Sequence, residues 1–188
     1  MSVSPSVAVV IPLRSLRSGK LRLAEQYDEK ARAQLIETMA NRVLSACHDL
    51  DVLVVHDDDS VAAWASARGA MALRPSLPGL NNAVTYGRDH LAEQGYDRVI
   101  IAHADLPHAN DLRVVLTDSP VSIVPDRHGD GTNVMCVDAK LDFAFAYGPD
   151  SFANHVEISR NLGIEPRIID APDLAWDVDY PNDVPETL

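Results

Sequence analysis

Asp105 is the residue whose position in the sequence suggests chemistry most strongly. It follows the apolar run 99–104 and is followed closely by Pro107. A run without polar side chains on either face indicates an interior strand of a covered sheet, and a proline ends such a strand. In open α/β sheets, ligands bind beyond the carboxyl ends of the strands. Asp105 is therefore a candidate catalytic residue, and the alternative is an aspartate that caps the next helix.

Asp177 and Asp179 form a second acidic feature near the end of the chain. Residues two apart in an extended segment project to the same side, so these two carboxylates point together while Trp176 and Val178 pack behind them. Two acids placed in this way repel each other unless a cation lies between them. The pattern predicts a site for a cation.

A basic loop follows the first expected strand, Val7 to Pro12. Residues 13–22 contain Arg14, Lys20 and Arg22 and no acid. Lysine acts as a point charge and arginine as a fork, a combination that suits a phosphate chain. Arg14 stands where a Walker loop has its first glycine, so this is not a Walker loop. The alternative is a basic loop that only faces solvent.

Three further segments could hold polar ligand groups. The glycine-containing loop 125–133 can bring backbone amides close to an anion. The segment 147–152 begins a helix, with Pro149 near its first position, and its free amides and the Ser151 hydroxyl can bind an anion or simply start a helix. Asn81 and Asn82 can either read the edge of a base or cap a helix.

These residues need strands and helices to position them, and the pattern predicts an alternation of the two. The expected helices are a long one capped by Asp28 and running through Cys47, 61–68 closed by Gly69, 83–93, and a short one capped by Asn110. The expected later strands are 52–55, 71–73, 121–124, 134–137 and 167–170. We interpret the acidic cluster 56–59 as loop and helix cap, in preference to a metal site. We expect a single domain over residues 1–188.

Composition narrows the function classes. A formal net charge of −12 over 188 residues argues against a polyanion such as nucleic acid as a partner, because that would require a basic face. Cys47 and Cys136 both lie in apolar surroundings, which predicts buried thiols and a reducing, cytoplasmic setting. The apolar run Val7 to Leu13 is too short for a signal or membrane segment, so we expect no membrane association.

Short motifs occur in order along nearly the whole chain. They are Ile11-Pro12-Leu13, Lys20-Leu21-Arg22-Leu23, Gly79-Leu80-Asn81, Ala104-Asp105-Leu106-Pro107, Pro125-Asp126-Arg127-His128-Gly129 with Gly131-Thr132-Asn133, Tyr147-Gly148-Pro149 with Ser151-Phe152, and Asp177-Val178-Asp179. This ordered set resembles the CofC/FbiD family, the guanylyltransferases of coenzyme F420 biosynthesis. The resemblance implies a Rossmann-like nucleotidyltransferase fold, similar to GT-A and MobA proteins, with a mixed, mostly parallel sheet flanked by helices.

The resemblance also implies a reaction and its cofactor. GMP passes from GTP to the phosphate of 2-phospho-L-lactate, phosphoenolpyruvate or 3-phosphoglycerate, and pyrophosphate leaves. Magnesium, held by Asp105, Asp177 and Asp179, neutralises the phosphates. Lys20 completes the catalytic set with these three acids.

The remaining expected site residues divide between the two substrates. For GTP they are Leu13, Arg14, Lys20, Arg22, Gly79, Asn81 and Asn82, and for the phospho-acid they are Arg127, Thr132, Asn133, Gly148 and Ser151. A homodimer and delivery of the product to the next transferase of the F420 pathway are expected partner relations. Asp130 and Asp150 depart from the usual pattern in the two anion-facing loops, and they leave the acceptor open.

Three other functions stay open on the sequence alone. A molybdopterin guanylyltransferase would be expected to have a glycine-rich first loop, and here that loop is basic. A glycosyltransferase would place its acid pair in the middle of the chain. A nucleotide-binding protein without turnover would not need to keep all three acids and Lys20.

Overall fold

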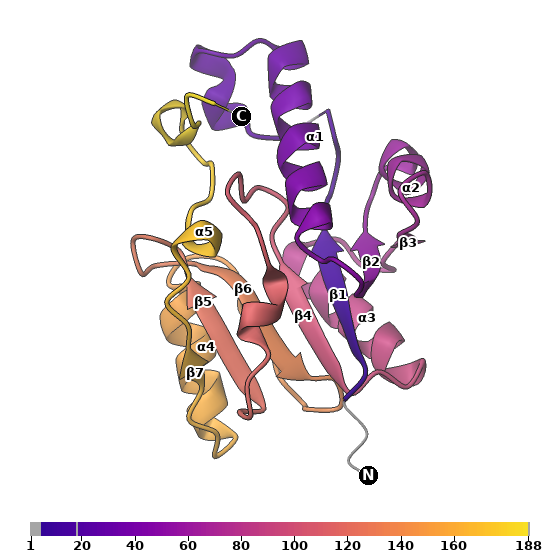
Figure 1. The fold of residues 1–188 in the computed structure, drawn as a ribbon, viewed down its shortest axis with the longest axis vertical. Coiled ribbons are helices and arrows are strands. Elements are labelled where there is room, and N and C mark those ends of the chain that lie inside the picture. Colours follow the sequence, from indigo (N-terminus) through magenta and orange to yellow (C-terminus); the bar gives the residue numbers. More distant parts are fainter. Residues whose placement is uncertain (1–4, 18, 188) are drawn as a thin grey trace.

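A computed structural model describes residues 5–17 and 19–187, and within these ranges the chain forms one seven-stranded sheet in the order β3-β2-β1-β4-β6-β5-β7 (Figure 1). The strands are β1 (Val7–Pro12), β2 (Asp51–Val55), β3 (Met71–Leu73), β4 (Arg98–Ala102), β5 (Val121–Pro125), β6 (Thr132–Asp138) and β7 (Arg167–Ile168). Residues 1–4 and 188, at the ends of the expected domain, and Ser18, in the expected basic loop, lie outside the described residues.

The sheet is mixed, because β6 runs against its neighbours. β1 pairs in parallel with β2 and with β4, β2 pairs in parallel with β3, and β5 pairs in parallel with β7. β6 is antiparallel to both β4 and β5. The predicted fold class, a mixed and mostly parallel sheet flanked by helices, is confirmed.

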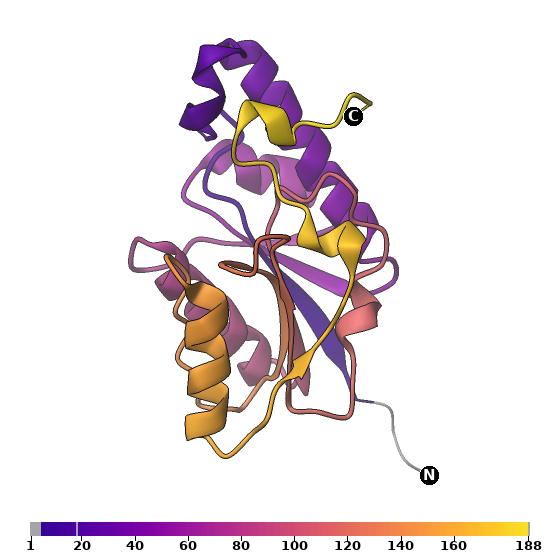
Figure 2. The same cartoon turned by 90° about the vertical axis from the view of Figure 1, so that its left-hand side faces the viewer.

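Alternation along the strands divides the core into two layers. Val9 and Ile11 of β1 belong to one apolar cluster, and Ala8 and Val10 belong to the other, on the opposite face of the sheet. The first cluster is covered by α1 (Glu29–Ser45) and α2 (Asp59–Ser66), and the second by α3 (Leu80–Glu93) and α4 (Ser151–Asn161). Figure 2 shows the separation of α4 from α1 across the sheet.

The helix boundaries correct several predictions. Asp28 caps α1 as expected, accepting the Ala31 N–H at 2.8 Å, but α1 ends at Ser45. The short helix Leu112–Val115 is capped by Asp111, whose carboxylate accepts the Arg113 N–H at 2.9 Å, so the prediction for Asn110 was wrong. Helix α3 begins at Leu80, whereas the predicted helix begins at residue 83.

The acidic cluster 56–59 supplies a helix cap, as predicted. Asp58 caps α2 by accepting the Ser60 N–H at 2.8 Å.

In α4 the N-cap is Asp150, in a left-handed conformation with φ 56°, so Pro149 lies outside the helix. Pro149 was predicted near the first helical position, and it instead precedes the N-cap residue.

After β7 the chain runs back toward the N-terminal helices. It passes through α5 (Pro172–Ala175) and the short helix Pro181–Asp183, and Figure 1 shows this yellow segment beside the indigo N-terminal helices. Val178 packs in a small apolar cluster with Leu23, Leu35 and Met39. This packing anchors residues 177–179 beside the basic loop. The described residues include no helix with the length and apolar character that crossing a bilayer requires.

Candidate active site

A cavity of about 800 Å³ lies beyond the carboxyl ends of β1 and β4. Its volume is typical of a site for small-molecule ligands. Loops that are far apart in the sequence form its wall, and the predicted site residues among the lining are Leu13, Arg14, Lys20, Arg22, Asp105, Thr132, Asn133, Gly148, Ser151, Asp177 and Asp179. The sheet therefore brings together most of the residues that the sequence singled out.

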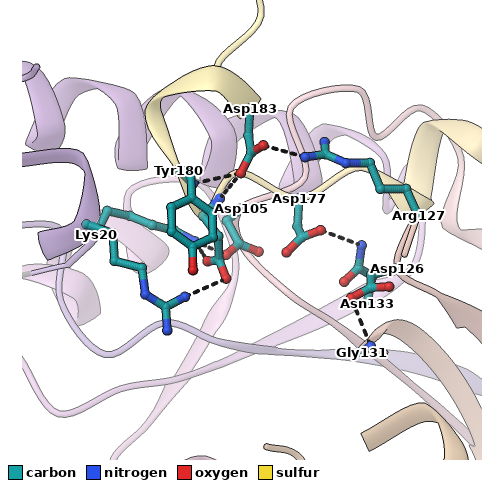
Figure 3. A network of polar contacts seen from close by, with 11 residues as sticks. Lys20, Asp105, Asp126, Arg127, Gly131, Asn133, Asp177, Tyr180 and Asp183 are labelled. Carbon is teal, nitrogen blue, oxygen red and sulfur yellow. Dashed lines mark hydrogen bonds and ion pairs between the residues drawn. The ribbon is translucent and has the colours of Figure 1, made fainter. Parts of the chain in front are cut away.

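Lys20 is the centre of the charged wall of this cavity (Figure 3). Its ammonium group donates hydrogen bonds to Asp105 Oδ2 and, at 3.0 Å, to Asp179 Oδ1. Arg22 Nη1 donates to the other oxygen of Asp179 at 3.1 Å. Lys20 has a left-handed backbone, with φ 57°, at the start of the short helix Leu21–Glu25. The predicted convergence of Asp105 with the Asp177 and Asp179 segment is present.

The charged side chains around Lys20 shift one another's pKa values. Burial disfavours the Lys20 ammonium, but Asp105 and Asp179 outweigh this effect and raise its pKa. Burial likewise opposes ionisation of Asp105, yet Lys20 and His103 hold the pKa of this carboxyl below its ordinary value. An ionised lysine beside an ionised Asp105 is therefore the stable state of this pair.

The pKa of Asp177 is shifted in the opposite direction to that of Asp105. Burial raises its pKa, and the negative charges of Asp105 and Asp179 raise it further. Among the described residues, the side-chain contact that opposes this rise is with the Asn133 amide, which donates to Oδ1 at 3.4 Å. Asp177 thus lies where an additional cation would be favoured.

The arrangement differs from the expected metal site. The cation between Asp105 and Asp179 is the ammonium of Lys20, and across residues 5–17 and 19–187 no three acidic, histidine or cysteine side chains are spaced to share an ion. Asp105 Oδ1 is nevertheless buried without a hydrogen-bond partner among the described residues. An unpartnered carboxylate oxygen beside the electrostatically unfavourable Asp177 fits a divalent cation, and the ligand assignment stays a prediction.

Arg127 does not line the cavity in the described part of the chain. It donates through Nη2 to Asp183 and lies over the Trp176 ring at 4.1 Å. Asp183 in turn accepts the backbone N–H groups of Asp179 and Tyr180, at 3.0 and 2.7 Å. Arg127 therefore supports the turn that carries Asp179, and a direct contact with the phospho-acid is not part of this arrangement.

The loop 125–133 also differs from the anion-binding interpretation. Asp126 accepts the N–H groups of His128, Asp130 and Gly131 at 2.9, 3.0 and 2.8 Å. A Cβ at Gly131 would lie 2.8 Å from Asp126 Oδ2, which explains the glycine. These amides are satisfied by the loop's own aspartate, so they are not free for an external anion.

Three residues that the sequence assigned to GTP lie off the cavity wall: Gly79, Asn81 and Asn82 are absent from its described lining, although Leu80 contributes. Asn81 clamps the backbone of Tyr147, accepting its N–H at 2.7 Å and donating to its carbonyl at 3.2 Å. Asn82 donates to the Pro78 carbonyl at 2.7 Å. The sequence suggested that Asn81 either caps a helix or reads the edge of a base. Neither interpretation included this bridge, which joins residues 66 positions apart in the sequence.

A polar network holds the second wall of the cavity. The Thr132 N–H donates to Ser151 Oγ at 3.0 Å, and the Thr132 hydroxyl lies 3.0 Å from Nδ1 of the fully buried His155. The Ala146 N–H donates to His155 Nε2 at 3.0 Å. The sequence reasoning missed His155, although it lies one helical turn after Ser151, and this spacing places both on one face of α4.

Comparisons with solved structures define the class of fold. A nucleotidyl transferase from Methanothermobacter superposes with a TM-score of 0.65 at 18% identity, covering 95% of this chain and 94% of that one. A CMP:2-keto-3-deoxy-manno-octonic acid synthetase in complex with CTP gives a TM-score of 0.62 at 16% identity, with 94% of each chain covered. The chain has the fold of the nucleotidyltransferases.

Sequence relatives identify the family. A phosphoenolpyruvate guanylyltransferase of Sphaerobacter thermophilus is 33% identical, over 94% of this chain and 90% of its own. A 2-phospho-L-lactate guanylyltransferase of Methanocaldococcus fervens is 29% identical, over 95% and 83%. The chain belongs to the family described as guanylyl transferase CofC like, whose model matches residues 7–188. This membership confirms the predicted family and class of enzyme.

Proposed function

We propose that the protein transfers GMP from GTP to the phosphate of phosphoenolpyruvate, with release of pyrophosphate, in coenzyme F420 biosynthesis. The family supports guanylyl transfer, and the 33% identity to a phosphoenolpyruvate guanylyltransferase favours this acid over 2-phospho-L-lactate and 3-phosphoglycerate. The observation that carries the proposal is one cavity with two distinct walls. One wall holds Lys20 between Asp105 and Asp179, and the other contains the hydroxyl-bearing residues Thr132 and Ser151.

The charged wall is proposed to hold the triphosphate. Lys20 and Arg22 lie together on it, and Arg14 is at its edge with an 87% exposed side chain. An exposed arginine can turn toward a phosphate without losing a buried contact. Lys20 is assigned to the β and γ phosphates, where its ammonium group offsets the charge of departing pyrophosphate.

A divalent ion, Mg²⁺, is proposed to be held by Asp105, Asp177 and Asp179. When bound, such an ion would neutralise the phosphate oxygens and the charge that develops at the reacting phosphorus. The chain's own contribution is to line one cavity with three carboxylates, two of which hold the Lys20 ammonium between them in this structure. Asn133 holds Asp177 in place by its amide at 3.4 Å.

The hydroxyl wall is proposed to hold the acceptor through its carboxylate, leaving the acceptor phosphate free to approach GTP. Thr132 and Ser151 are 1% and 3% exposed, so their positions are fixed by packing. The Gly148 to Ser151 segment leads into α4, whose N-terminal amides favour an anion. The acceptor phosphate is already ionised at neutral pH, so the reaction needs no side-chain base to activate it.

The proposal also covers the location of the protein, its oligomeric state and the delivery of its product. We assign a cytoplasmic location, because a reducing compartment suits the buried free thiols Cys47 and Cys136. Homodimer formation and delivery of the guanylylated acid to the next transferase of the pathway are also proposed. A molybdopterin guanylyltransferase is the alternative of the same class, and the basic residues after β1 favour the reaction proposed here.

The test is product identification. The purified protein is incubated with GTP, Mg²⁺ and each of the three acids in turn, and the products are examined by phosphorus NMR and mass spectrometry. A new diphosphate that joins GMP to phosphoenolpyruvate, formed with equimolar pyrophosphate, is the expected result. Pyrophosphate release that requires molybdopterin, or bound GTP with no product from any acid, would refute the proposal.

A further inference from the structure

His155 lies behind the hydroxyl wall and is 0% exposed, so it cannot touch a ligand in the cavity. Its two ring nitrogens nevertheless have different partners in that wall. Nε2 faces the Ala146 N–H at 3.0 Å, and Nδ1 faces the Thr132 hydroxyl at 3.0 Å. The T-shaped contact with the Tyr147 ring, with centroids 4.8 Å apart, fixes the plane of the imidazole.

The backbone partner decides the tautomer. An amide N–H can only donate, so Nε2 must accept and must carry no proton. Burial lowers the pKa of His155 to about 4, and the charge of His103 acts in the same direction, so the ring is neutral at physiological pH. A neutral ring with a bare Nε2 has its proton on Nδ1. Nδ1 therefore donates to Thr132 Oγ1.

The direction of this bond sets the direction of the next. Thr132 Oγ1 accepts from His155, so its own proton must point elsewhere. Ser151 Oγ accepts the Thr132 N–H at 3.0 Å, which likewise directs the serine proton elsewhere. Both residues line the cavity, and the described residues supply no acceptor for either proton. This leaves both protons available to an anion in the cavity.

We infer that His155 is a positioning residue that fixes the Thr132 hydroxyl as a hydrogen-bond donor toward the acceptor's carboxylate. This inference rests on the proposed function for the identity of the anion. It assigns His155 to acceptor affinity and not to the chemical step. With the opposite tautomer the Thr132 proton would be held by Nδ1, and an oxygen lone pair would face the carboxylate.

Two substitutions separate the two contacts of the imidazole. In His155→Asn the amide occupies the position of Nδ1 and can still donate to Thr132. In His155→Gln the amide reaches the position of Nε2, so it can accept from Ala146 but no longer sets the Thr132 hydroxyl. The experiment measures kcat and both KM values for the full chain with each variant, using GTP and phosphoenolpyruvate.

The inference predicts that His155→Gln raises the KM for phosphoenolpyruvate by about tenfold, the effect of one lost hydrogen bond to a charged group. The KM for GTP stays unchanged, and His155→Asn stays close to the wild type. The Gln substitution should have no further effect in a Thr132→Val background, because the hydroxyl is already gone. Any other ordering of the two variants, or additive effects in the double variant, would overturn the inference.

The tautomer itself gives a readout that needs no activity. Long-range proton–nitrogen NMR of wild-type protein with nitrogen-15 histidine should show the proton of His155 on Nδ1, and a proton on Nε2 overturns the inference even if a variant fails to fold. This readout also separates the two claims. Failure of every acid to react refutes the proposed function, whereas the tautomer decides the role of His155 alone.

Discussion

Replacing Lys20 by methionine tests the electrostatic structure of the charged wall. Methionine keeps an unbranched stem of similar length and removes the ammonium group. The Lys20 side chain is 15% exposed, and its partners Asp105 and Asp179 are 22% and 45% exposed. After the substitution, Asp105 is a largely buried carboxylate without its cation, while Asp179 keeps Arg22 at 3.1 Å.

The expected loss follows from this difference between the partners. Removing one member of a fully buried ion pair costs about 3–5 kcal/mol, and an exposed pair contributes about 0–1 kcal/mol. Since Asp179 is half exposed and retains Arg22, nearly all of the loss comes from Asp105. We expect the free energy of unfolding to fall by about 3 kcal/mol near neutral pH.

The loss should depend on pH. In the wild type the pKa of Asp105 lies below its ordinary value, so the ionised carboxyl stabilises the fold above pH 3.8 and this contribution is lost below it. Without Lys20, burial is less opposed and raises the pKa of Asp105. The folded variant then takes up a proton before the unfolded chain does, and the difference from the wild type should narrow as the pH is lowered toward about 4.

Urea unfolding followed by tryptophan fluorescence measures these values, with Lys30→Met, a substitution of an exposed lysine on α1, as the control. The double variant Lys20→Met/Asp105→Asn should lose clearly less stability than the sum of the two single variants, because the unpaired charge is gone. Additive losses, or a loss that is the same at every pH, would refute the reasoning.

Three further expectations concern the metal, a pH dependence and the Tyr147 clamp. Mg²⁺ without nucleotide should raise the Tm of Lys20→Met more than that of the wild type, because the ion can replace the missing ammonium; equal shifts in thermal melts would contradict this. His155 has a pKa of about 4 in the fold against 6.5 for an ordinary histidine, so its contribution to the free energy of unfolding falls as the pH drops from 6.5 to about 4, by about 3 kcal/mol in total. Urea titrations across this range should show a shallower decline for His155→Asn, and an identical decline in both proteins speaks against the assignment. Asn81→Ala removes both hydrogen bonds to Tyr147, so it should lower the free energy of unfolding by about 1–2 kcal/mol and raise the KM for the acid, with Asn82→Ala as control; a change in the KM for GTP alone, at unchanged stability, would favour the base-reading role.

The sequence predicts features that depend on local pattern. The apolar run ending at Asp105 indicated β4 and the edge of the sheet where the cavity lies, and the spacing of Asp177 and Asp179 indicated acids on one side of the chain. Both predictions required only that successive side chains of a strand point to opposite faces and that ligands bind at the carboxyl ends of strands.

Features that depend on distant partners were not predictable in this way. Arg127 has the same local sequence whether it faces a ligand or Asp183, 56 positions later, and only the folded chain shows the second arrangement. Asn81 likewise meets its partner Tyr147 across the fold. The spacing of Asp177 and Asp179 predicted a cation between those two acids, whereas the structure shows Lys20 between Asp105 and Asp179.

The most direct test of guanylyl transfer at this cavity is the rate of pyrophosphate release by Asp105→Asn with GTP, Mg²⁺ and phosphoenolpyruvate. The substitution keeps the size of the side chain and removes one charge from the wall that Lys20, Asp105 and Asp179 form. We expect kcat to fall by about 10² or more, the effect of losing one preorganised electrostatic group, while circular dichroism stays unchanged. A folded Asp105→Asn variant that releases pyrophosphate at nearly the wild-type rate would contradict the account.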